Sequence, residues 1–171
     1  IIDAGSFPGL FTIYASKKTG PKGKIISFEP EEENYYWVDK EIKLNGIKNI
    51  KNYQKALWDD NKTLKISSNE AMSKISNKGK EIEAVSLDSF IENKLHLDRI
   101  DFIKMDIEGA EIGALKGAEE TLKKYHPDLA IATYHLVNGE RTCYKVEDFL
   151  SSIGYDVNTN YEKHLTTYAH Y

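Results

Sequence analysis

Short apolar runs alternate with helical patterns along this chain, and the alternation restricts the fold more than any other feature of the sequence. Residues 25–28 form an apolar run that ends at Glu29 and Pro30, and the next segment places Val38 and Ile42 at helical spacing. An apolar run followed by a helical pattern occurs five times before two final runs that suggest a hairpin. Such alternation predicts a mostly parallel sheet with helices on both faces and right-handed crossovers.

Three further segments have patterns that predict secondary structure. Residues 61–85 hold two short strand patterns around a loop rich in Ser, Asn and Lys, which predicts a small β insertion. Residues 87–95 predict a short helix. Residues 115–125 predict one continuous helix, because apolar side chains recur on one face of the pattern.

The length of the chain bears on its domain organisation. At 171 residues the chain has the length of one domain, and neither a linker nor an internal repeat divides it. We therefore expect a single domain over residues 1–171. Because the sequence starts at Ile1, without a methionine and within a strand pattern, we also expect further residues upstream in the full protein.

Composition and charge argue against several classes of partner. The net charge of -4 offers no global attraction to nucleic acid or anionic membranes, and no run of 18 apolar residues predicts a membrane span. Cys143 is the only cysteine, so no disulfide can form within this sequence, which fits a reducing compartment. We expect a cytoplasmic protein without a nucleic-acid partner and without a membrane span.

Residues that could carry chemistry follow the predicted parallel strands. In open α/β sheets, ligands bind outside the carboxyl ends of the strands, where side chains from several strands converge. The candidates, in chain order, are Asp3, Gly5, Ser6 and Gly9, then Glu29, then Asp106 and Glu108, and finally His135. Their convergence predicts one ligand site at this edge of the sheet.

The loop after the first strand, which reads DAGSFPG, favours a cationic ligand. A dinucleotide fingerprint would need G-x-G-x-x-G, whereas the glycines here are spaced G-x-x-x-G and Pro8 removes one backbone N–H. The leading acid would repel a pyrophosphate but would attract a cation. S-adenosylmethionine carries an ammonium and a sulfonium and no phosphate, so the loop favours this cofactor.

Glu29 follows the second predicted strand, where a carboxylate can accept hydrogen bonds from both hydroxyls of a ribose. Dinucleotide-binding folds use an acid at the same place, so Glu29 alone does not select the cofactor. A NAD-dependent oxidoreductase of Rossmann type therefore remains an alternative, and the missing G-x-G-x-x-G argues against it.

Four stretches of the sequence together resemble the FkbM-type S-adenosylmethionine-dependent methyltransferases. They read IDAGSFPGLFT, ISFEPEEENY, NYQKALWDD and DFIKMDIEGAEIGALKGAEETL, and the most specific piece is KMDIEGAE followed by LKGAEETL. The resemblance implies a Rossmann-like class I methyltransferase fold, with a seven-stranded, mostly parallel sheet whose last strand is antiparallel. It also implies O-methylation of a hydroxyl on a sugar, glycolipid or small natural product, with S-adenosylmethionine as cofactor.

The resemblance further implies a set of residues that bind the cofactor. Within this set Asp3 and Gly5 would line the methionine part, and Glu29 would hold the ribose. Ala56 would lie beside the adenine, and Asp106 near the amino group and the transferred methyl. The full set is Asp3, Gly5, Ser6, Phe7, Gly9, Glu29, Ala56 and Asp106.

Asp106, Glu108 and His135 are the catalytic candidates. His135 is the favoured general base for an acceptor hydroxyl, because the pKa range of imidazole suits proton removal near neutral pH. The three could also hold a divalent cation, but a helix start explains Glu111 fully and Glu108 in part, which favours a site without a metal. The expected partner is a small-molecule or glycan acceptor. A non-catalytic protein of this fold that binds another protein remains a second alternative.

Overall fold

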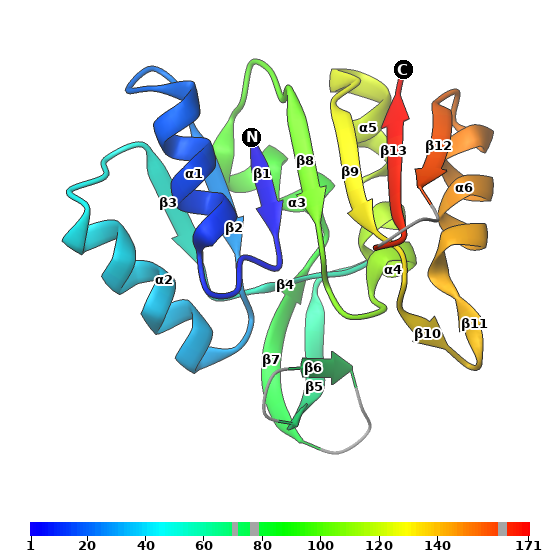
Figure 1. The fold of residues 1–171 in the computed structure, drawn as a ribbon, viewed down its shortest axis with the longest axis horizontal. Helices are drawn as coiled ribbons and strands as arrows, with labels where there is room; N and C mark the ends of the chain where they lie inside the picture. The colour runs from blue at the N-terminus through cyan, green and yellow to red at the C-terminus, as the bar shows by residue number, and fades with distance from the viewer. Residues whose placement is uncertain (70–71, 76–78, 161–163) are drawn as a thin grey trace.

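A seven-stranded sheet forms the centre of the computed structural model (Figure 1). The structure describes residues 1–69, 72–75, 79–160 and 164–171. Across the sheet the strands follow the order β12 (Asp156–Asn160), β13 (Thr166–His170), β9 (Asp128–Ala132), β8 (Phe102–Met105), β1 (Ile2–Ala4), β2 (Ile25–Phe28) and β3 (Ile50–Tyr53). Strand β13 pairs antiparallel with both of its neighbours, and the remaining pairs are parallel. The predicted fold is confirmed, including the antiparallel last strand.

The register of the strands brings the carboxyl ends of the parallel strands to one edge. Ala4, at the end of β1, is paired with Phe28 of β2 and with Met105 of β8. Backbone hydrogen bonds continue just past the strands, because Gly5 N donates to Phe28 O and Asp106 N donates to Ala4 O. Residues that follow β1, β2 and β8 therefore lie beside one another.

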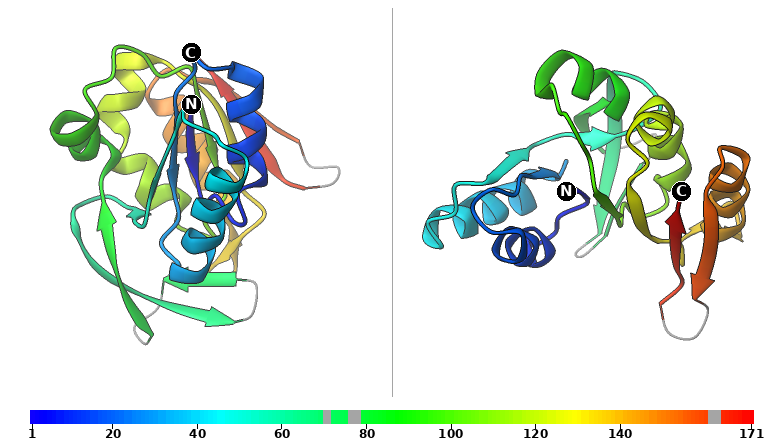
Figure 2. Two further views of the ribbon diagram at one scale, coloured as in Figure 1. Left: turned by 90° about the vertical axis from the view of Figure 1, so that its left-hand side faces the viewer. Right: turned by 90° about the horizontal axis from the view of Figure 1, so that it is seen from above.

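Helices cover both faces of the sheet (Figures 1 and 2). Helices α1 (Leu10–Thr19) and α2 (Glu32–Leu44) lie on one face, and α3 (Leu87–Phe90), α4 (Glu111–Lys116), α5 (Glu119–Tyr125) and α6 (Thr142–Ser152) lie on the other. The main hydrophobic core lies between the sheet and this second group, with Leu115, Leu122 and Leu150 fully buried in it. Among the helices of the described part of the chain, none is both long and apolar enough to cross a lipid bilayer.

A second, four-stranded sheet lies beyond the carboxyl edge of the central sheet (Figure 1). Its order is β4 (Ala56–Leu57), β7 (Lys80–Val85), β5 (Lys62–Asn69) and β6 (Met72–Ile75). Strand β6 falls where a polar loop was predicted, so that part of the prediction was wrong. The strand is stabilised by antiparallel pairing with β5, and its short polar sequence gives no local signal of that pairing. Residues 70, 71 and 76–78 of the same predicted loop lie outside the described residues.

The helix predicted over residues 115–125 is divided into α4 and α5, so the prediction of one continuous helix was wrong. A Cβ on Gly117 would come within 1.9 Å of the Trp58 carbonyl oxygen, because the chain passes close to Trp58 at this point. The Asp88 carboxylate accepts hydrogen bonds of 3.1 and 2.7 Å from two backbone N–H groups in the first turn of α5. The new helix start is thus capped by a residue from α3, which the local pattern cannot show.

The short helix predicted over residues 87–95 is helical throughout but changes its geometry half way. Helix α3 is followed directly by η1 (Ile91–Leu95), which has π-helical hydrogen bonds. His96 N donates to Ile91 O at 3.1 Å, five residues back along the chain. Apolar periodicity alone does not distinguish this wider turn from an α-helix.

Candidate functional site

A cleft opens at the carboxyl edge of the central sheet, where the second sheet approaches it. The ends of β1, β2 and β8 form one wall, and β4, β5 and β7 contribute another. Six residues that the sequence singled out line this cleft: Gly5, Phe7, Glu29, Ala56, Asp106 and Glu108. The site therefore combines side chains from both sheets.

Part of the cleft wall is apolar. Ala56 and Leu57 of β4 lie in this wall together with Ile66 of β5 and Ile82 of β7. Apolar side chains of this kind suit a flat aromatic ring such as an adenine. Of these four residues only Ala56 is among the predicted site residues, because the contributions of the two isoleucines depend on how the second sheet packs against the first.

Glu29, directly after β2, is a buried acid of the cleft with 5% of its surface exposed. Its Oε2 accepts a hydrogen bond from Phe7 N at 3.2 Å, and its Oε1 accepts one from Glu31 N at 3.0 Å. Burial raises the pKa of Glu29, although these backbone N–H groups act to lower it. The Asn34 side chain also interacts with the carboxylate, and the remaining acceptor capacity of Glu29 is available to a ligand hydroxyl.

The first loop (residues 5–9) approaches β8 closely at Gly5. This glycine has φ +77°, and a Cβ there would meet the backbone oxygen of Asp106 at 1.9 Å, so no larger residue fits. Gly9 has φ +98° and packs on α2, where a Cβ would contact Val38 at 3.4 Å. Phe7, between the two glycines, is 55% exposed and borders the cleft.

Asp3 and Ser6, two of the predicted cofactor-binding residues, are buried and are not among the residues that line the cleft. Asp3 accepts a hydrogen bond from Thr12 Oγ1 at 2.5 Å, and its Oδ1 lies 3.2 Å from Lys104 Nζ. Burial raises the pKa of Asp3, whereas the charge of Lys104 lowers it. Lys104 also donates to the Gly5 carbonyl at 2.6 Å and lines the cleft. Lys104 is not among the predicted site residues, because one lysine within a strand pattern matches no motif.

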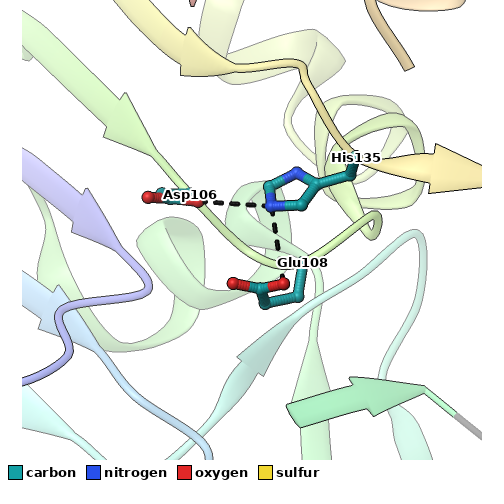
Figure 3. Close-up of side chains that lie close together, drawn as sticks. All are labelled: Asp106, Glu108 and His135. Atoms are coloured by element: carbon teal, nitrogen blue, oxygen red, sulfur yellow. Dashed lines mark ion pairs between the residues drawn. The ribbon is translucent and has the colours of Figure 1, made fainter. Parts of the chain in front are cut away.

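Asp106, Glu108 and His135, called here the acid–histidine cluster, meet beside the cleft (Figure 3). The two acids follow β8, and His135 follows the neighbouring strand β9. His135 Nε2 lies 3.5 Å from Asp106 Oδ1 and 3.5 Å from Glu108 Oε2. The side chains of Asp106 and Glu108 are 36% and 23% exposed, whereas that of His135 is buried. The cluster thus presents its carboxylates to the cleft and keeps the imidazole behind them.

Glu111 adjoins the acid–histidine cluster, and the sequence prediction of its role was incomplete. It does lie in the first turn of α4, as an acid at a helix start, but its side chain is fully buried. Glu111 Oε1 lies 2.9 Å from His135 Nδ1 and accepts a hydrogen bond from Gly109 N at 3.1 Å. The third acid of the MDIEGAE stretch was the signal that could have revealed this contact.

The surroundings of His135 affect its predicted role as a general base. Burial lowers the pKa of the imidazole, but the contact with Glu111 and the charges of Glu111, Glu108 and Asp106 outweigh burial, so the pKa is raised. An imidazole that holds its proton more firmly is less suited to remove another proton near neutral pH. The general-base role stays a prediction.

Comparison with known proteins relates the chain to methyltransferases. The model of the methyltransferase FkbM domain family matches residues 3–157. Methyltransferase 1 of Beauveria bassiana (strain ARSEF 2860) is 24% identical over 146 residues, which cover 70% of this chain and 58% of that protein. Methyltransferase sdnD of Sordaria araneosa is 26% identical over 194 residues, which cover 92% of this chain and 73% of that protein.

A solved structure shares the fold. The crystal structure of methyltransferase FkbM from Methylobacillus flagellatus KT superposes with a TM-score of 0.75 at 21% sequence identity, covering 99% of this chain. This chain spans 42% of the length of the Methylobacillus protein and 58% of that of the Beauveria protein. The likeness at such identity concerns the arrangement of strands and helices and not the ligands.

Proposed function

Because this chain belongs to the FkbM methyltransferase family and has the class I methyltransferase fold, we propose that it binds S-adenosylmethionine in the cleft and methylates a hydroxyl group of a second molecule. One observation carries the proposal: Glu29 lines the same cleft as Asp106 and Glu108. An acid suited to a ribose and a polar cluster suited to a hydroxyl would therefore border the same bound molecule.

The cleft matches the chemical parts of S-adenosylmethionine. The apolar wall around Ala56 and Ile82 would hold the adenine, and Glu29 would accept hydrogen bonds from the ribose hydroxyls. Asp106, beside the first loop, would attract the ammonium group, whereas it would repel the pyrophosphate of a dinucleotide. When bound, S-adenosylmethionine supplies a methyl group attached to a sulfonium, which is a good leaving group.

Residues of the chain itself would orient the acceptor. Phe7 is exposed at the border of the cleft, and Tyr134 is exposed beside the acid–histidine cluster. Their rings can pack on the apolar faces of a sugar or natural product. Tyr134 also donates a 3.4 Å hydrogen bond to Asp106 Oδ1, which ties it to the cluster. Methyl transfer requires the acceptor oxygen within about 3–3.5 Å of the reacting carbon. The proposed acceptor is a hydroxyl of a sugar, glycolipid or small natural product.

Calorimetric titration tests the cofactor class. We expect S-adenosylhomocysteine to bind with one site per chain and NAD not to bind. Binding of NAD in place of S-adenosylhomocysteine would contradict the methyltransferase proposal and support the oxidoreductase alternative.

Transfer of a labelled methyl group tests the acceptor class. S-adenosylmethionine labelled in the methyl group would be incubated with the protein and a panel of sugars, glycolipids, natural products and matched amines. We expect label only in acceptors with a hydroxyl group, and loss of label when that hydroxyl is removed. Label confined to amines would exclude O-methylation.

A further inference from the structure

The acid–histidine cluster has the composition and spacing of a metal site. Asp106, Glu108 and His135 each offer one donor atom, and these atoms all lie within 4.8 Å of one another. We propose that the three residues bind one divalent transition-metal ion of the Mn²⁺ type. The binding site is independent of methyl transfer, whereas its role in holding the acceptor hydroxyl rests on the proposed function.

The Nε2 atom of His135 provides the main argument. His135 is only 5% exposed, and its Nδ1 lies against Glu111 at 2.9 Å. Within the described part of the chain, neither ring nitrogen forms a well-aligned hydrogen bond, but Nδ1 is in close contact with Glu111 whereas the two carboxylates nearest Nε2 lie 3.5 Å away. A buried polar atom without a hydrogen bond is unfavourable, so Nε2 is expected to meet a group that the protein chain does not supply.

The separations within the cluster suit a shared cation better than a shared proton. A charge-assisted hydrogen bond between nitrogen and a carboxylate oxygen has a length of about 2.7–2.9 Å, which is well below the two observed distances of 3.5 Å. With metal–ligand bonds of about 2.1 Å, two donor atoms at that separation subtend roughly 110° at the ion. Figure 3 shows Nε2 facing both carboxylates, as a common ion would require.

Glu111 would orient the imidazole for metal binding. A histidine that binds a metal commonly donates its other ring N–H to a carboxylate, which sets the tautomer and the ring orientation. Glu111 is fully buried on the Nδ1 side of His135 and is itself held by the N–H of Gly109. This arrangement leaves Nε2 as the ring nitrogen that is directed at Asp106 and Glu108.

The donor atoms and their exposure indicate the kind of ion and its use. One imidazole nitrogen with two carboxylate oxygens suits Mn²⁺ and related transition ions better than Ca²⁺, which takes oxygen ligands. Asp106 and Glu108 are partly exposed and line the cleft, so the remaining positions around the ion would face the acceptor. A hydroxyl oxygen bound to such an ion would have a lowered pKa and would release its proton to water more readily.

Titration of chelator-treated protein with Mn²⁺ tests this site, with the free ion followed by electron paramagnetic resonance. We expect one Mn²⁺ site per chain, with or without S-adenosylhomocysteine. Glu111→Gln should weaken Mn²⁺ binding about 10–100-fold, and Glu108→Gln and Asp106→Asn, which replace a charged carboxylate ligand by a neutral amide oxygen, at least as much. His170→Ala is the matched control, because His170 contacts Asp128 at 2.8 Å at the opposite edge of the sheet.

The outcomes separate the metal site from the proposed function. Absence of Mn²⁺ binding by the unaltered protein, or unchanged affinity in both ligand variants, would overturn the metal proposal. Protein that binds S-adenosylhomocysteine but no Mn²⁺ refutes the metal site alone, whereas protein that binds only Mn²⁺ supports the site and contradicts the cofactor proposal. Circular dichroism on each variant verifies the fold, and the partly exposed positions of Glu108 and Asp106 make their amide variants the decisive pair.

Discussion

The Glu29 carboxylate accepts hydrogen bonds from the backbone N–H groups of Phe7 and Glu31. In the proposed function it also accepts hydrogen bonds from the hydroxyls of a ribose. Glu29→Gln keeps the shape and removes the charge. We expect the variant to weaken S-adenosylhomocysteine binding by about 1.5–3 kcal/mol, the range for hydrogen bonds to a charged group. Calorimetry measures the change, and Glu33→Gln on the exposed surface of α2 is the control. Equal affinity in both variants would remove Glu29 from the ligand contacts.

The pH dependence of binding offers a second test of this residue. Burial raises the pKa of Glu29 above its ordinary value of 4.5, so its protonation begins at a higher pH than that of an exposed glutamate. Because the ionised form is the better hydrogen-bond acceptor, affinity should be full above the raised pKa and should fall as the pH drops through it. Calorimetry at successively lower pH, starting from about pH 8, should show this decline in the unaltered protein. The same decline in Glu29→Gln would show that another group titrates.

Lys104 is the counter-charge of a fully buried acid, Asp3, and also holds the first loop through Gly5. Lys104→Met would leave the Asp3 carboxylate buried without its cation. We expect the free energy of unfolding to fall by about 3 kcal/mol, the lower end for a broken buried pair, because Lys104 is itself partly exposed. Denaturant unfolding measures the loss. Lys123→Met, which breaks an exposed pair with Glu119, should have little effect and is the control.

At the level of secondary-structure elements, the separation of α4 from α5 depends on a contact between distant helices. Asp88 of α3 accepts two hydrogen bonds from the first turn of α5. Asp88→Ala should therefore lower the free energy of unfolding by about 1–2 kcal/mol, as the loss of a helix cap does. Denaturant unfolding is the measurement. Glu92→Ala, on the exposed surface of η1, should change stability much less, and a matching loss there would contradict the capping role.

For the molecule as a whole, the cleft is lined by residues of both the central sheet and the second sheet. A ligand that contacts both sheets stabilises the folded chain by mass action. At 100 times its dissociation constant, S-adenosylhomocysteine should add about 2.7 kcal/mol, which raises the unfolding temperature by roughly 5–10 °C for a chain of this size. Scanning calorimetry measures the shift. An unchanged unfolding temperature at saturating ligand would contradict binding to the folded cleft, and Glu29→Gln should need more ligand for the same shift.

The alternation of strands and helices in the central sheet, and the type of that sheet, could be predicted from the sequence. These features depend on local patterns, namely apolar runs, helical periodicity and turn residues, which neighbouring residues display directly. Because parallel strands end at one edge, the sequence also sufficed to choose Glu29, Asp106, Glu108 and His135 as candidates. The structure brings the last three into one cluster and places Glu29 in the adjoining cleft.

Which side chains from different elements meet depends on the folded structure. The contact of Glu111 with His135 joins α4 to the end of β9, and the pair of Lys104 and Asp3 joins two neighbouring strands that are far apart in the chain. The extra strand β6 likewise requires its partner β5. Periodicity reports which face of an element is buried, but it does not report which side chain from another element lies opposite. That choice depends on packing distances and on the need of buried charges for a partner, and both arise only when the elements assemble.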